Sequence, residues 1–155
     1  PKRVMSWKEA WEIYFEQRNW EKCSATLLNI AQTRKKDPNI MGMLGIALSN
    51  QNQPEKALFI FNEGLKACPQ AKKQAVFHRY IGNLYLAVNN PEEAQKEFRY
   101  AVSKDWSNPD GHLGLAVTYL NQRKAKEGRE SLNTVLRLDP NNAKAKELLA
   151  KLGKP

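Results

Sequence analysis

Residues 75–106 read AVFHRYIGNLYLAVNNPEEAQKEFRYAVSKDW, and this stretch decides the fold because its pattern recurs along the chain. Its first half places four residues at i, i+3, i+4 and i+7, on one face of a helix: His78, Ile81, Gly82 and Tyr85. We expect a neighbouring backbone to approach closely at the glycine. Asn90 and Pro91 predict a second helix start, because asparagine accepts hydrogen bonds from first-turn amides and proline fits the first helical position. The second helix carries three residues inward: Ala94, Phe98 and Ala101.

The same spacing recurs with an offset of 34 residues from Ala75 to Pro109 and of 37 residues from Pro38 to Ala75. Good copies of the pattern cover residues 38–72, 75–108 and 109–142, and a degenerate copy covers residues 4–37. Residues 143–152 keep three leucines and predict a helix that caps the last exposed core face. The predicted helices are Met5–Gln17, Trp20–Lys35, Ile40–Gln51, Glu55–Ala67, Lys72–Val88, Pro91–Lys104, Asp110–Gln122, Ala125–Leu138 and Ala143–Leu152.

These copies resemble the tetratricopeptide repeat, whose pattern has a large residue, Leu-Gly, an aromatic residue, Ala, a second aromatic residue and a closing Pro. The resemblance implies an all-α fold. It would be a right-handed α-solenoid of helix-turn-helix repeats with a C-terminal capping helix, in a single domain over residues 1–155. Three residues depart from the family pattern. Trp106 replaces the closing proline, Gly128 replaces the usual alanine, and Trp11 stands at the glycine position of the first copy.

In the tetratricopeptide repeat family, one side of each first helix lines a concave groove that receives extended peptides or partner helices. The resemblance transfers this groove to nine residues: Ile46, Asn50, Arg79, Asn83, Leu86, Leu113, Val117, Leu120 and Asn121. Arg79 and Asn83 are expected to anchor polar groups of the ligand above an apolar floor. A complete carboxylate clamp is not expected, because Ile46, Val117 and Asp110 occupy the related positions. The alternative is that the apolar residues of this set pack against second helices or an in-chain terminus.

Charge is the second functional signal, because 25 Lys and Arg against 16 Asp and Glu give a net charge of +9. Basic residues concentrate in the C-terminal third, which supplies one candidate basic surface: Arg123, Lys124, Lys126 and Arg129. Such a field attracts acidic partners and permits weak contact with nucleic acids or anionic membranes. The sequence lacks an interleaved aromatic platform, zinc ligands and RNA-binding signatures, which disfavours nucleic acid as the partner. A solvated helical face is the simplest alternative.

The sequence contains no motif for catalysis, for a cofactor or for a metal. It lacks GxxxxGK[ST], GxGxxG, HExxH, GxSxG and CxxC. Cys23 and Cys68 lie near no histidine cluster, so we expect both to be small apolar packing residues. His78 and His112 share one core-facing repeat position, which favours packing over catalysis. No apolar run reaches the length of about 18 residues that a membrane-spanning helix needs.

These signals predict a non-catalytic adaptor or scaffold whose partner is a protein or peptide, with an acidic protein as one candidate. The first alternative is a basic module that binds nucleic acids or anionic surfaces. The second is a self-assembling structural component, forming homo-oligomers through an aromatic N-terminal end that carries Trp7, Trp11, Tyr14 and Trp20. These rings would otherwise fill the end of the terminal repeat. We expect a cytoplasmic location, and the initial Pro1 indicates a processed chain or a fragment of a longer protein.

Overall fold

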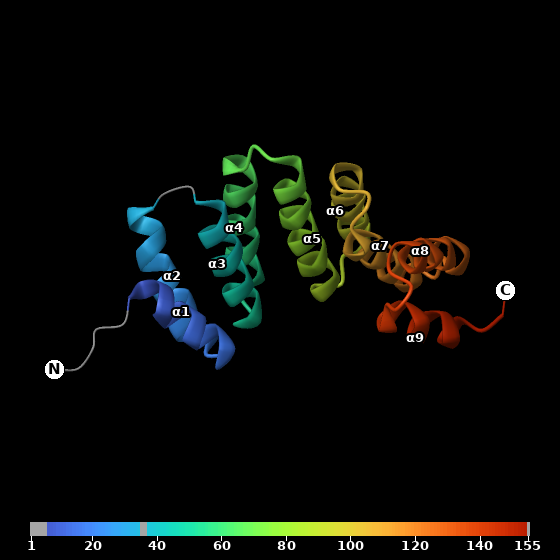
Figure 1. Ribbon diagram of the computed structural model, residues 1–155, viewed down its shortest axis with the longest axis horizontal. Helices are drawn as coiled ribbons and strands as arrows, with labels where there is room; N and C mark the ends of the chain where they lie inside the picture. Colours follow the sequence, from blue (N-terminus) through green and yellow to red (C-terminus); the bar gives the residue numbers. More distant parts are fainter. Residues whose placement is uncertain (1–5, 35–36, 155) are drawn as a thin grey trace. The chain divides into compact units, whose positions relative to one another are not determined.

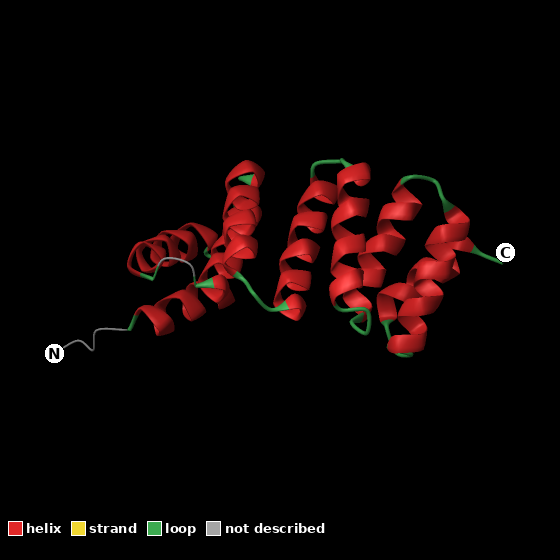
Figure 2. Ribbon diagram, turned by 90° about the horizontal axis from the view of Figure 1, so that it is seen from above, coloured by secondary structure: helices red, strands yellow, loops and turns green. Residues whose placement is uncertain are grey.

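The computed structural model describes residues 6–34 and 37–154, except for the side chain of Trp7. These residues form α-helices joined by short turns, and the described ranges contain no strand (Figure 1, Figure 2). The chain divides into two compact units, an N-terminal unit that ends at Pro69 and a C-terminal unit that begins at Gln70. The predicted helix limits Met5 and Lys35, and the predicted position of the Trp7 side chain, lie outside the described residues.

The helices follow one another as helix-turn-helix pairs. The N-terminal unit contains α1 (Trp7–Glu16), α2 (Trp20–Thr33), α3 (Pro38–Asn50) and α4 (Pro54–Ala67). The C-terminal unit contains α5 (Ala71–Ala87), α6 (Pro91–Lys104), α7 (Pro109–Asn121), α8 (Ala125–Leu138) and α9 (Ala143–Leu152). This arrangement confirms the predicted all-α fold. Four helices begin one or two residues earlier than predicted. In three of them a proline takes the first position, Pro38, Pro54 and Pro109, and the fourth, α5, begins at Ala71 instead of Lys72.

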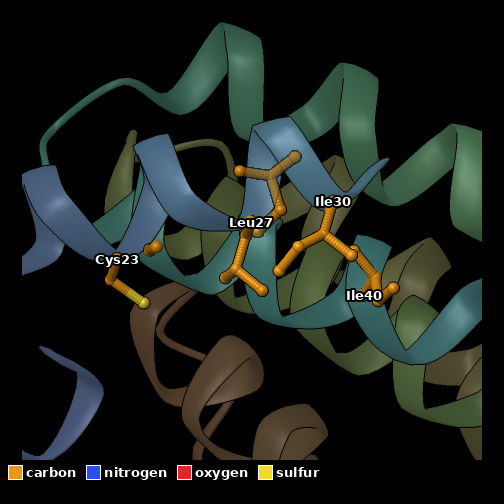
Figure 3. Packing of buried hydrophobic residues seen from close by; sticks show 6 residues of the cluster. Cys23, Leu27, Ile30 and Ile40 are labelled. Atoms are coloured by element: carbon orange, nitrogen blue, oxygen red, sulfur yellow. The ribbon is translucent and has the colours of Figure 1, made fainter. Parts of the chain in front are cut away.

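The core of the N-terminal unit lies between α2 and α3. Cys23, Leu27 and Ile30 of α2 are buried with Ile40 of α3, and Figure 3 shows Ile40 beside Ile30. The spacing of the three α2 residues, at i, i+4 and i+7, places them on one face of that helix. Burial raises the pKa of the Cys23 thiol, because the thiolate loses its hydration there. Cys23 is therefore a packing residue, as predicted.

The aromatic side chains at the beginning of the chain pack against this core. Trp11, Tyr14 and Trp20 are partly buried, and Phe15 joins them. The Phe15 ring meets the Trp20 ring edge to face, with centroids 5.3 Å apart and an interplanar angle of 85°. This packing is the alternative that competes with an exposed aromatic patch for self-assembly. The described rings at this end are therefore engaged in packing while partly exposed, and self-assembly stays a prediction.

The core of the C-terminal unit is organised around Phe98 of α6. Its ring contacts α5 and α7 where a Cβ would stand on Gly82 and on Gly114, so neither position accepts a side chain without displacing the ring. The expectation that a neighbouring backbone approaches Gly82 is wrong, because this side chain fills the space. At the C-terminal end, Ala145 is buried with Leu132 and Val135 of α8, so α9 covers that helix.

Each of the four helical pairs turns through a residue in the left-handed region. The four residues are Arg18, Asn52, Asn89 and Arg123, with φ between 54° and 60°. In each turn, the amide of the following residue donates to a carbonyl five residues back, as Asn90 N–H does to Tyr85 (2.8 Å) and Lys124 N–H to Tyr119 (2.9 Å). These bonds satisfy carbonyls at the end of the first helix, in the manner of a Schellman motif. The backbone of the turn is thus the same in all four pairs.

Trp106, at the closing-proline position, contacts His112 through its ring and its backbone oxygen. His112 Nε2 lies 2.8 Å from the backbone oxygen of Trp106, and the two rings meet at an angle of 77° with centroids 5.1 Å apart. The His112 side chain is buried, so this contact satisfies a polar atom at the start of α7. His78 has a different partner, because its Nδ1 lies 2.7 Å from Glu97 Oε2.

Candidate functional site

A pocket of about 300 Å³ lies along α5 and α7 of the C-terminal unit. Five of the nine predicted groove residues line it: Arg79, Asn83 and Leu86 of α5, and Leu113 and Val117 of α7. The remaining lining residues are Phe98, Asp110, Gly114 and Lys144. We call this pocket the α5–α7 groove. Its residues recur at helical spacing on one face of each first helix, which is the reason that the repeat pattern could identify them.

The charges of the α5–α7 groove are partly neutralised within the chain. Arg79 Nη1 lies 3.2 Å from Asp110 Oδ2, and the Arg79 side chain is only 19% exposed. Asp110 is 57% exposed, and its backbone N–H donates to Asn108 Oδ1 (2.9 Å) at the start of α7. Lys144 of α9 contributes a further cation to the lining. The groove therefore offers donors and acceptors beside an apolar surface, and its arginine already has a carboxylate partner.

Two predicted groove residues of α7 lie elsewhere. Leu120 packs with the core of α8, and its Cδ2 lies 2.6 Å from the point where a Cβ would stand on Gly128. This contact explains why glycine replaces the usual alanine at that position. Asn121 lines a different pocket, described below. For Leu120, the structure shows the alternative in which an apolar residue packs against a second helix.

Ile46 and Asn50 belong to α3 of the N-terminal unit. Asn50 Nδ2 donates to the backbone oxygen of Ile46 (2.9 Å), so this amide is bonded to its own helix. Ile46 is partly buried and Asn50 is exposed. The two residues therefore form a local pair within α3.

A second pocket of the C-terminal unit, of about 610 Å³, gathers basic residues from α6 and from the α7–α8 turn. We call it the basic pocket. Its lining residues are Pro91, Glu92, Gln95, Lys96, Arg99, Asn121, Gln122, Arg123 and Lys124. Arg123 and Lys124 belong to the predicted basic surface, whereas Lys126 and Arg129 lie on α8 outside this lining. Lys96 and Arg99 were not singled out by the sequence, because only the packing of α6 beside α7 brings them to the turn (Figure 1).

The N-terminal unit holds an apolar pocket of about 630 Å³ that the sequence did not predict. Its surface includes Leu28 of α2 and Phe59 of α4, both exposed, with Leu44 and Leu48 of α3. Two polar side chains at its edge bond to one acceptor, since Ser24 Oγ and Gln53 Nε2 both donate to Gln51 Oε1 at 3.3 Å. Leu28 and Phe59 could have indicated this pocket in the sequence, because both are large apolar residues on helix faces that do not belong to the core.

In the described ranges, no three His, Cys, Asp or Glu side chains lie together in a way that could hold a metal ion. The His78–Glu97 pair is partly buried, and the His78 ring lies 5.2 Å from the Tyr100 ring, so that histidine has packing and polar partners. None of the helices described in the structure has both the length and the apolar character of a membrane span.

The comparisons with known proteins agree with this repeat architecture. The family model described as "Tetratricopeptide repeat" matches residues 85–152. The chain is 27% identical over 117 residues to the anaphase-promoting complex subunit CDC16 of Saccharomyces cerevisiae. That match covers 73% of this chain and only 14% of the relative.

Solved structures extend the likeness over both units. The chain matches a chain of the APC/C hetero-tetramer Cut9–Hcn1 with a TM-score of 0.85 and 17% identity, over 96% of this chain and 29% of that one. It also matches the first tetratricopeptide repeat domain of Spaghetti (RPAP3) bound to the HSP90 peptide SRMEEVD, with a TM-score of 0.70 and 20% identity, over 74% of this chain and 91% of that one. The family match identifies residues 85–152 as tetratricopeptide repeat sequence, and the repeated helical pairs with these structural matches show the tetratricopeptide repeat fold over both units.

Proposed function

We propose that this chain is a protein-interaction scaffold that binds a peptide segment in the α5–α7 groove. One observation carries the proposal: Arg79, Asn83 and Leu86 of one first helix line the same pocket as Leu113 and Val117 of the next. Stacked repeats use surfaces of this kind for binding, because their core residues are already committed to the stack. The Spaghetti domain, a structural neighbour, is bound to a peptide and supports the proposal by analogy.

The groove favours an extended or helical segment with apolar side chains. Leu86, Leu113 and Val117 supply the apolar contact, and the exposed Asn83 amide can both donate to and accept from a peptide backbone. Asp110 beside Arg79 disfavours a buried ligand carboxylate, because the two carboxylates would compete for one guanidinium. We therefore infer that the ligand is recognised through apolar side chains and backbone groups, with Arg79 as a polar anchor.

The test selects twelve-residue peptides from a displayed random library on the wild-type chain and measures their affinity by fluorescence polarisation. Arg79→Ala combined with Leu86→Glu should weaken binding of the selected peptides about tenfold or more, because a charge replaces an apolar contact. The control combines Arg137→Ala with Val88→Glu, which makes the same chemical changes at exposed positions outside the groove. Unchanged affinity in the folded groove variant would show that the peptides bind elsewhere.

A further inference from the structure

The basic pocket presents cations that the chain leaves without carboxylate partners. Lys96 Nζ lies 2.9 Å from Glu93 Oε1, but Arg99, Arg123 and Lys124 form no ion pair with any residue that the structure describes. Arg99 is oriented by a neutral group, because its Nη2 donates to Tyr119 Oη (3.2 Å). The pocket thus combines one positioned guanidinium from α6 with two cations from the α7–α8 turn. A ligand that supplies anions would satisfy all three.

The fold itself does not explain the residues of the α7–α8 turn. Arg123 has a φ of 60°, in a region that asparagine and glycine adopt more readily than arginine does. Lys124 is the N-cap of α8, where its side chain accepts no hydrogen bond and its charge faces the positive end of the helix dipole. The corresponding residues of the preceding pair are Asn89, with a φ of 59°, and Asn90, which accepts from Glu93 N–H at 3.4 Å. Both basic residues therefore oppose local stability.

A further atom indicates what kind of anion fits. Gln122 lines the basic pocket, and its Oε1 atom is buried and has no hydrogen-bond partner among the described residues. This acceptor needs a donor, which a peptide backbone supplies and a phosphodiester backbone does not. A ligand with carboxylates and backbone N–H groups meets both requirements at once. An acidic peptide has this combination.

We propose that the basic pocket binds an acidic peptide segment of a partner protein. Side-chain carboxylates of the segment contact Arg99, Arg123 and Lys124, and a backbone N–H of the segment donates to Gln122 Oε1. The net charge of +9 supports this recognition, because it speeds encounter with acidic partners. The site is separate from the α5–α7 groove, since the two linings share no residue.

The experiment measures binding by fluorescence polarisation with three labelled probes. They are a ten-residue peptide of alternating Glu and Ala, its neutral counterpart of alternating Gln and Ala, and a ten-nucleotide oligothymidylate. Arg123→Asn combined with Lys124→Asn reproduces the Asn89–Asn90 turn and removes two cations. We expect this variant to bind the Glu–Ala peptide about tenfold more weakly while its Tm stays equal or rises. The retained Tm separates loss of binding from loss of folding.

The matched control combines Lys146→Gln with Lys154→Gln, which removes the same charge at exposed positions away from the pocket. It should retain the affinity for the Glu–Ala peptide within about twofold. The groove variant, Arg79→Ala with Leu86→Glu, should also retain it, so failure of one proposal leaves the other intact. Equal losses in the turn variant and the lysine control would overturn the inference, as would equal binding of the Gln–Ala peptide. Tighter binding of oligothymidylate that depends on Arg123 and Lys124 would assign the pocket to nucleic acid instead.

Discussion

The α5–α7 groove and the basic pocket belong to the same unit, but their basic residues differ in whether they have carboxylate partners within the chain. In the groove, Arg79 is paired with Asp110 of the next first helix. In the basic pocket, Arg123 and Lys124 have no carboxylate partner in the described part of the chain, and Arg99 of the same lining donates to Tyr119 Oη. A paired charge orients a ligand without selecting strongly for its sign, whereas unpaired cations select for anions. The two proposals therefore give this unit two ligand chemistries, an apolar segment in the groove and an acidic segment in the basic pocket.

The largest change in stability should come from substituting Phe98, which lines the groove and packs between α5 and α7. Phe98→Ala should lower the free energy of unfolding by about 3–5 kcal/mol, because it removes a buried ring and leaves a cavity. Equilibrium urea unfolding measures this loss. The control is Phe59→Ala in the N-terminal unit, where the ring is 64% exposed, and it should cost less than about 1 kcal/mol. Similar losses for the two variants would contradict the central place of Phe98.

A smaller effect should distinguish the two turns that begin α6 and α8. Asn90→Ala should lower stability by about 1 kcal/mol, because Asn90 Oδ1 accepts from Glu93 N–H at the start of α6. Lys124→Ala should change stability by less than about 0.5 kcal/mol, since Lys124 provides no side-chain cap to α8. Thermal unfolding of the two single variants tests the pair. A loss at Lys124 as large as the one at Asn90 would show that the lysine stabilises the fold.

The smallest effect should follow from Asp110→Asn, which releases Arg79 in the α5–α7 groove. The ion pair is partly exposed, so stability should change by less than about 1 kcal/mol. The freed guanidinium should raise the affinity for a selected groove peptide that ends in a free carboxylate by about threefold. Fluorescence polarisation measures the gain. If Arg79→Ala in the Asp110→Asn background kept that gain, Arg79 would not be the group that receives the carboxylate.

The repeat pattern predicted most of the fold because core packing follows helical periodicity. Phe98, Leu132 and Val135 are buried as their spacing requires, and the limits of α6, α8 and α9 agree with the predicted segments. The limits of other helices differ by one or two residues, both at starts where proline is the first helical residue and at ends where the last predicted residue is the C-cap. The resemblance to the family, carried along this periodicity, also predicted five residues of the α5–α7 groove, because first-helix positions repeat from one pair to the next.

The remaining features depend on contacts that periodicity does not encode. The Arg79–Asp110 pair joins residues of two helices through long side chains whose rotamers the spacing leaves open. The Leu120 side chain packs against α8 and not in the groove, because Gly128 has no side chain to fill that space. Lys96 and Arg99 lie beside the α7–α8 turn only because the α5–α6 pair packs against the α7–α8 pair. These are contacts between repeats, whereas the sequence pattern describes one repeat at a time.

The Phe98 ring that fills the Cβ positions of Gly82 and Gly114 has a consequence for transplanting repeats between proteins. The three positions form one steric unit, although a cut at the repeat boundary before Pro109 separates the ring from Gly114. A block containing only α5 and α6 would therefore keep the contact between Phe98 and Gly82 but lose the one with Gly114. Its new neighbour would need a glycine at the sixth position of its first helix to accommodate the ring. Homologues should show correlated substitution at these three sites, with a smaller residue at position 98 wherever a side chain replaces either glycine.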